Sequence, residues 1–220
     1  MNKIFFLFLL LLSFKSYSQT YIEISNQMIS LKSRDNLYKG EMNVNSNFNP
    51  KISGRYTFYK HDKIISYFVE GSNSLVKFNQ NGFDPNNINL NQLGIGLRLK
   101  PEPQIAFDLG IGIKESLIIN STNGLYELDK QLFPTINFKG QLALITNKNI
   151  SVIADGLGTY FVKSNDYRGH EIGLGLSVNY KIYDNSTLVK TGYRIDYESN
   201  YNQNVSNGMF KHNLYFRLFF

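Results

Sequence analysis

Apolar and polar residues alternate along most of the chain after its first twenty positions. Between residues 93 and 100 the odd positions are leucine or isoleucine, whereas the even positions are glycine, arginine or lysine. Successive side chains of a β-strand point to opposite faces, so this alternation predicts strands with one apolar and one mixed face. Similar patterns, some weaker, recur at 21–32, 52–59, 64–75, 105–114, 136–144, 150–162, 172–182, 187–198 and 214–220.

The segments between these predicted strands alternate in length. Short connections are predicted at 61–62, 101–103, 147–149 and 184–185, and long polar ones at 33–49, 79–91, 120–130, 163–169 and 200–208. An antiparallel meander in which long and short connections alternate has all its long loops at one end, as transmembrane barrels do. We therefore predict an all-β fold, a closed antiparallel up-and-down transmembrane β-barrel of about ten strands; a barrel of eight strands is the alternative.

The mixed face of these strands is predicted to point into the barrel. It carries glycines such as Gly94, Gly110 and Gly173, which weaken a solvent-facing strand but relieve crowding on the inside of a narrow barrel. The leucines and isoleucines then face lipid, and the strands must close because lipid cannot satisfy an open edge. The charges predicted to line the lumen are Arg55, Glu70, Arg98, Asp108, Lys114, Lys139, Asp155, Lys181, Lys190, Arg194 and Asp196.

Two interpretations of these lumen charges stay open. In the first, they neutralise one another and fill the interior, as in small barrels generally. In the second, they line a narrow pore with a slight excess of cations, which favours anions. The inward parity of Phe68, Phe161 and Tyr215 favours the filled interior.

The first residues, 1–18, have the pattern of a secretory signal peptide. A short basic start precedes an apolar run over 4–14, and Ser16 and Ser18 supply the small residues of a cleavage site. The apolar run is shorter than the ~20 residues of a spanning helix. The predicted organisation is therefore an export signal followed by one barrel domain, 19–220. Without cysteine the chain can form neither a lipoprotein anchor nor a disulfide.

The last predicted strand ends on alternating apolar residues, Phe216, Leu218 and Phe220. With the export signal and the alternation from residue 21 onward, this strand resembles that of the small bacterial outer-membrane barrels, the OmpA-type, OmpX-like and PorT-like proteins. The resemblance implies a place in the outer membrane of a diderm bacterium, in contact with lipid and lipopolysaccharide. It also implies insertion by the barrel-assembly machinery, for which these three residues would be the signal. OmpA-type barrels have eight strands, whereas about ten are predicted here.

The sequence offers little catalytic chemistry. His61 falls in a short turn, and His170 and His212 share the outward parity of their apolar neighbours, so no histidine is expected beside an inward carboxylate. We predict no catalytic residue, no cofactor and no metal site. An outer-membrane hydrolase with a site at the rim is one alternative, and a soluble secreted β-protein is another.

The remaining functional hypothesis is binding at the cell surface. The first long loop carries Arg34, Lys39 and Glu41, and the other loops are rich in Asn, Ser and Tyr, which suit an extracellular ligand or lipopolysaccharide phosphates. The formal net charge of +6 is spread along the chain without a Lys/Arg run, so nucleic acid is not a predicted partner. The predicted role is structural, surface-binding or that of a narrow, porin-like pore.

Overall fold

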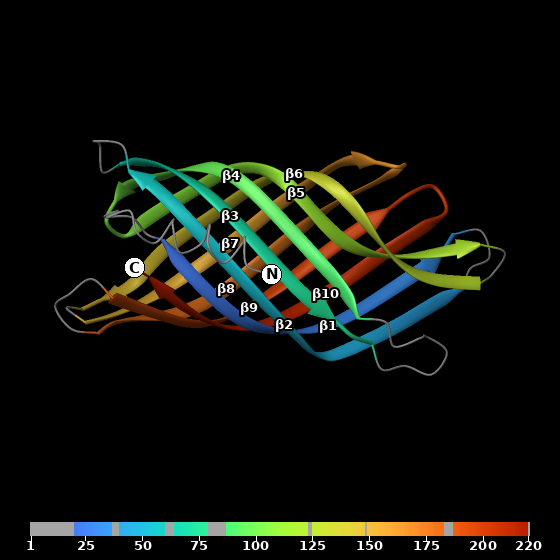
Figure 1. Ribbon diagram of the computed structural model, residues 1–220, viewed down its shortest axis with the longest axis horizontal. Coiled ribbons are helices and arrows are strands. Elements are labelled where there is room, and N and C mark those ends of the chain that lie inside the picture. The colour runs from blue at the N-terminus through green and yellow to red at the C-terminus, as the bar shows by residue number, and fades with distance from the viewer. Residues whose placement is uncertain are drawn as a thin grey trace, which may run out of the picture.

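Ten antiparallel strands form one closed barrel in the computed structural model, which describes residues 20–36, 40–59, 64–78, 87–122, 125–147, 149–182 and 187–219 (Figure 1). The strands are β1 (Tyr21–Asp35), β2 (Glu41–Tyr59), β3 (Ile65–Val76), β4 (Ile88–Glu102), β5 (Ile105–Thr122), β6 (Leu125–Thr146), β7 (Ile150–Ser164), β8 (Tyr167–Ile182), β9 (Thr187–Tyr201) and β10 (Val205–Phe219). The fold class and the ten-strand count predicted from the sequence are confirmed.

Neighbouring strands in the sequence are neighbours in the wall, and β1 pairs with β10 to close it. The closing register runs from Tyr21 opposite Phe219 to Asp35 opposite Val205. Both described ends of the chain, Thr20 and Phe219, therefore lie at the same end of the barrel. We call this the inner end, and the opposite end, which carries the β1–β2 and β5–β6 connections, the outer end.

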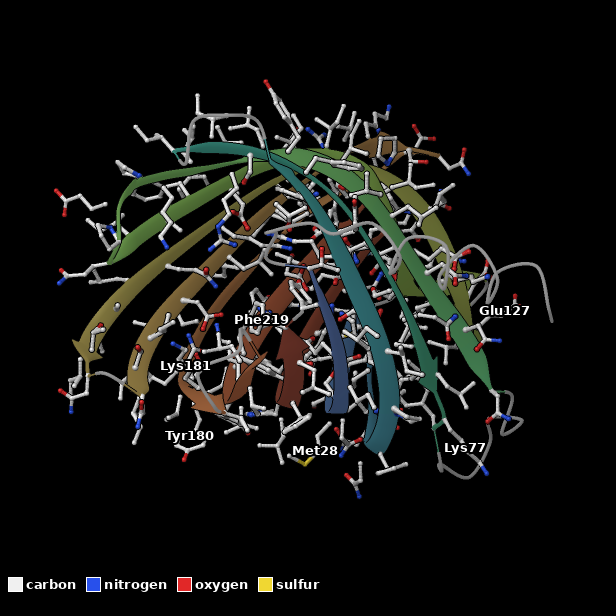
Figure 2. The ribbon with its side chains drawn as sticks, turned by 60° about the vertical axis from the view of Figure 1, so that its left-hand side comes forward. Met28, Lys77, Glu127, Tyr180, Lys181 and Phe219 are labelled. Carbon is white, nitrogen blue, oxygen red and sulfur yellow. The ribbon has the colours of Figure 1, made fainter. Side chains whose placement is uncertain are left out.

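The outer surface of the wall is apolar, as the alternation predicts. Leu174, Ile111 and Ile95 are each more than half exposed, and the same face of every strand carries further leucine, isoleucine or aromatic side chains. Met28 and Tyr180 lie on this outer face (Figure 2). A soluble β-protein would pack these residues inward, which the barrel does not. Among the described residues, no helix has the length and apolarity of a membrane-spanning one.

The long loops predicted at 33–49, 120–130, 163–169 and 200–208 are wrong for most of their length, because strands occupy them. Of the one predicted at 79–91, residues 88–91 belong to β4 and 79–86 lie outside the described residues. β1 and β2 are separated by five residues, 36–40, and β7 and β8 by two, 165–166, where Asn165 and Asp166 have positive φ. Polar residues such as Asn43 and Asn45 pair along a backbone ladder as well as apolar ones do. A strand needs only ~9–11 residues to cross a bilayer. The 15 to 22 residues of strands such as β1 and β6 therefore extend past the apolar region.

The outer part of the β5–β6 hairpin leaves the wall. β5 pairs with β4 only as far as Lys114, and β6 pairs with β7 only from Thr135 onward. Beyond these points the two strands pair with each other alone, as far as Thr122 opposite Leu125. We call residues 115–132 the plug hairpin. In Figure 1 it projects at the outer end, the right-hand side of the view, in the same region as the β1–β2 hairpin.

Candidate functional site

The lumen is densely filled with charged side chains. Of the eleven predicted lumen charges, Arg55, Glu70, Asp108, Lys114, Lys190 and Asp196 are buried, and Arg98, Lys139, Asp155 and Arg194 are partly buried. Lys181 differs, because it is exposed near the inner end of β8. The structure brings the other ten into ion pairs with one another or with further lumen residues.

A first network of ion pairs lies toward the inner end. Arg55 donates from Nη2 to Glu70 Oε2 over 2.6 Å and from Nη1 to Asp108 Oδ2 over 2.5 Å. Lys139 Nζ lies 2.8 Å from Glu70 Oε1, and Arg98 Nη2 donates to Gln141 Oε1 over 2.5 Å. These residues come from five consecutive strands, β2 to β6, so the network ties one half of the wall together across the lumen.

A second network lies toward the outer end and contains two lysines and two glutamates. Lys114 Nζ is 2.8 Å from Oε2 of both Glu171 and Glu198. Lys211 Nζ is 2.9 Å from Glu171 Oε1 and also pairs with Glu198. Asn200 Nδ2 donates to Glu198 Oε1 over 2.9 Å. Each ammonium therefore bridges both carboxylates, which balances the four charges where water is scarce.

The sequence prediction missed further charged residues of the lumen. Glu171 and Lys211 precede the predicted starts of their strands at residues 172 and 214, so they were assigned to no strand face. Glu23 of β1 pairs with Arg217 Nη2 over 2.5 Å. In this segment Asn26 and Gln27 leave neither face clearly apolar, so the sequence predicts no inward face there. Extending the predicted strand 172–182 by one residue toward the N-terminus, and the strand 214–220 by three, would have identified Glu171 and Lys211 as lumen residues.

The inner end of the lumen is filled by arginines stacked on aromatic rings. The Arg55 guanidinium lies 3.9 Å from the Phe68 ring centre, and that of Arg217 lies 4.0 Å from the Tyr21 ring centre. Tyr215 is buried beside Arg217, with its ring centre 5.5 Å away. Guanidinium groups favour such stacking when they are removed from water. The inner end therefore has a narrow polar and aromatic filling.

The outer end of the lumen is closed by an apolar cluster. Its buried members are Ile29, Leu31, Val44, Val76, Phe78, Leu117, Ile119 and Met209. Leu117 and Ile119 come from one face of the plug hairpin, while Ile118, on the other face, packs with Phe133, Phe161 and Tyr167. Because both faces of β5 are buried here, the plug hairpin crosses the barrel mouth instead of lining it.

Polar side chains hold the plug hairpin where it leaves the wall. Glu115 accepts a 2.8 Å hydrogen bond from the backbone amide of Asn91 on β4, and pairs with Lys130 at 2.9 Å. Gln131 Nε2 donates to Ser164 Oγ of β7 over 3.0 Å. The Asn91 amide, at the edge of β4 from which the hairpin departs, thus has an acceptor, and side-chain contacts tie the hairpin to both β4 and β7.

Little space remains between the two closures. The cavity inside the lumen measures about 120 Å³ and is lined by members of both charge networks. At ~10–15 Å³ for each water in this measure, the cavity holds on the order of ten waters. This volume fits solvent and small ions.

The histidines form no acid–base site in the described part of the chain. His170 is exposed on the outer face, and His212 Nδ1 lies 2.5 Å from the Tyr193 hydroxyl, also on that face. His61 lies outside the described residues. Within the described ranges, no group of three or more His, Asp or Glu side chains is placed to hold a metal ion.

The residues of the predicted assembly signal are described only in part. Phe216 is 46% exposed on the outer face of β10, and Leu218 is partly buried on the same face. Phe220 lies outside the described residues. The recognition of this strand by an assembly machinery stays a prediction.

Comparison with known proteins supports the fold. No family model matches the chain, and no curated protein matches it. Among solved structures, the outer membrane protease OmpT from Escherichia coli is similar, with 12% identity, a TM-score of 0.50, and 94% of this chain and 99% of that chain covered. An outer-membrane channel from Pseudomonas putida F1 matches with 10% identity and a TM-score of 0.45, covering 91% and 95% of the two chains.

At these identities the similarity concerns the fold alone, and the fold is that of bacterial outer-membrane barrels. An apolar outer wall around a charged interior is the arrangement that a bilayer requires. The outer surface of this barrel meets that requirement along all ten strands. Together, the fold and the apolar wall place the protein in a bacterial outer membrane.

Proposed function

We propose that this protein is a closed outer-membrane barrel whose lumen does not conduct solutes, and whose role is structural and at the cell surface. The plug hairpin carries this proposal. Leu117 and Ile119 are fully buried against Leu31 and Val44 from the opposite side of the mouth. A water-filled pore would require these apolar groups to separate.

The charge networks support the same conclusion from the lumen. Each carboxylate of the outer network is bound by both Lys114 and Lys211, and the inner network bridges five strands. An ion that entered would have to displace such pairs in a space of about 120 Å³. Of the two interpretations of the lumen charges, the structure favours the filled interior over the pore.

The surface role rests on the strand ends that extend past the apolar wall. The tip of the β1–β2 hairpin carries the exposed pair Lys32–Glu41 at 2.9 Å, with Arg34, Asn43 and Asn45 also exposed. With the lumen closed, such polar tips are the surface left for an extracellular ligand or lipopolysaccharide. Lys39 lies outside the described residues.

Conductance in a planar bilayer tests the proposal. The wild-type barrel should insert without forming channels. In a matched variant, a two-residue Asn-Gly turn replaces residues 117–130, which joins Ser116 to its register partner Gln131. This variant should conduct, because it loses the plug while the pairing of β5 with β4 and of β6 with β7 is kept. Steady channels from the wild type would contradict the proposal.

The protease activity in the name of OmpT is not extended to this chain. A hydrolase with its site at the rim would need a general base there, and the histidines described above face outward without a carboxylate partner. The double variant His170→Ala, His212→Ala tests this directly. It should leave unchanged any peptide or lipid hydrolysis that the purified barrel shows.

A further inference from the structure

Lys51 is the unusual charge of the lumen. It lies on β2 with the inward parity of Arg55 and Thr57, and it lines the interior cavity. Within the described residues it has no carboxylate within 4 Å, whereas every other lysine and arginine that lines the cavity does. Lys51 is partly buried, so its ammonium group is partly removed from water without a carboxylate beside it.

The carboxylates that line the cavity are paired with cations other than Lys51. Each one that lines the cavity is already within 4 Å of another cation. Among the described side chains, Lys51 is therefore the cation of this cavity that has no carboxylate in direct contact.

Several neutral hydrogen-bond donors lie near Lys51. Ser74 is directly opposite Lys51 on β3, and Ser72 and Gln92 face the same cavity. Ser53, two residues away on β2, donates to Glu23 Oε1 over 3.1 Å. Arg194 also lines the cavity, and its charge repels that of Lys51, whereas the more distant Glu23 and Glu171 attract it. Arg194 donates from Nε to Asp196 over 2.7 Å, and no other carboxylate lies within 4 Å of its guanidinium in the described part of the chain. Hydroxyl and amide donors beside two cations are the chemistry that binds an anion.

We propose that the lumen holds one small inorganic anion, of the chloride class, bound by Lys51 and Arg194 with donors from Ser72, Ser74 and Gln92. The size of the cavity limits the ligand to a monatomic ion or a small oxyanion. This inference rests on the closed lumen of the proposed function, because in an open pore the same cations would exchange ions with bulk solvent. The anion supplies the negative charge that the protein does not.

Anomalous diffraction with bromide as the probe tests the site. The full chain is refolded in detergent with sodium bromide as the sole halide, so that the ion can enter before the barrel closes. Crystals should then show a bromine peak about 3–3.5 Å from Lys51 Nζ, a hydrogen-bond distance enlarged for the ion. The variant Lys51→Met should lose the peak, and Lys181→Met, at an exposed position, should keep it. No peak at Lys51, or a peak that persists in Lys51→Met, would overturn the inference.

Thermal unfolding gives a second readout that needs no crystals. A ligand that binds only the folded state raises the unfolding midpoint with its concentration. The unfolding midpoint of the wild type should rise with the bromide concentration, while a bulky sulfonate salt keeps the ionic strength constant. The midpoint of Lys51→Met should not depend on bromide. Equal bromide dependence in both proteins would contradict the site. If the wild type forms no channels in a planar bilayer and also binds no bromide, this inference alone is rejected. If the wild type forms channels, the closed lumen is rejected.

Discussion

The backbone amide of Ile119 donates a hydrogen bond to the Asn207 side chain, with the amide nitrogen 3.1 Å from Oδ1. Ile119 belongs to the plug hairpin and Asn207 to β10, and the two strands are not neighbours in the wall. The bond therefore spans the mouth of the barrel. It fixes the depth at which Leu117 and Ile119 enter the apolar cluster.

Replacing Asn207 with Ala should loosen the plug hairpin without unfolding the barrel. The Ile119 amide would be left buried without its acceptor, at a cost of about 1–3 kcal/mol. Hydrogen exchange followed by mass spectrometry should show faster exchange in peptides covering 115–122. Asn73→Ala removes an exposed side-chain bond to Asn91 and serves as the control. Unchanged exchange in Asn207→Ala would show that the bond does not hold the hairpin.

Replacing Glu198 with Gln should destabilise the outer charge network. The amide keeps the shape of the side chain but leaves Lys114 and Lys211 with one shared carboxylate, Glu171. Breaking a buried ion pair on one side costs about 3–5 kcal/mol. Urea unfolding in lipid vesicles, followed by tyrosine fluorescence, measures the loss. Glu41→Gln breaks the exposed pair with Lys32 and should leave the midpoint where it is.

Introducing Arg at Leu174 should disturb the lipid-facing wall. Leu174 is 76% exposed on the outer face of β8, among other apolar side chains. A cation in the hydrocarbon region of a barrel wall costs about 2–4 kcal/mol near the midplane. The yield of folded, heat-modifiable barrel in vesicles should fall accordingly. Ser30→Arg, at an exposed position nearer the outer end, should fold normally, and equal yields for both variants would argue against a lipid-facing Leu174.

Gly112 should tolerate no side chain. A Cβ atom there would lie 2.2 Å from the backbone oxygen of Leu93, because β4 and β5 approach closely at this level. Gly112→Ala should therefore lower the refolding yield sharply. At Gly158 a Cβ atom would meet no heavy atom within 4 Å, so Gly158→Ala is the matched control and should refold like the wild type. Electrophoresis of unboiled samples measures both yields.

The orientation of the side chains in the barrel wall could be predicted from the sequence, because the apolar face of an alternating strand in a closed sheet can point only toward the lumen or toward lipid. Since the glycines and charged residues share one face, the apolar face is the one in contact with lipid. Leu93 and Ile95 are accordingly exposed on the outer face of β4. The same parity places Arg55, Glu70 and Asp108 inside. The partners of each charge could not be predicted, because they depend on which strands meet across the lumen.

The plug hairpin could not be predicted for a related reason. Residues 116–119 read Ser-Leu-Ile-Ile, without alternation, because both faces of this segment are buried in the mouth. Its polar neighbours Asn120 and Lys130 resemble a surface loop in composition. In the fold, Asn120 accepts a hydrogen bond from the Tyr167 hydroxyl over 2.5 Å. Only the three-dimensional arrangement distinguishes such an inward hairpin from a solvated loop.

The pairing of β1 with β10 has a consequence for biogenesis. The strand that completes the ring is the last of the ten to leave the ribosome, so the earliest strand waits with one edge unoccupied until all the others have been made. Unpaired edges recruit other chains. A nascent chain shortened before Val205 would keep both edges exposed, and we expect it to be cleared by proteolysis in the periplasm instead of accumulating in the membrane.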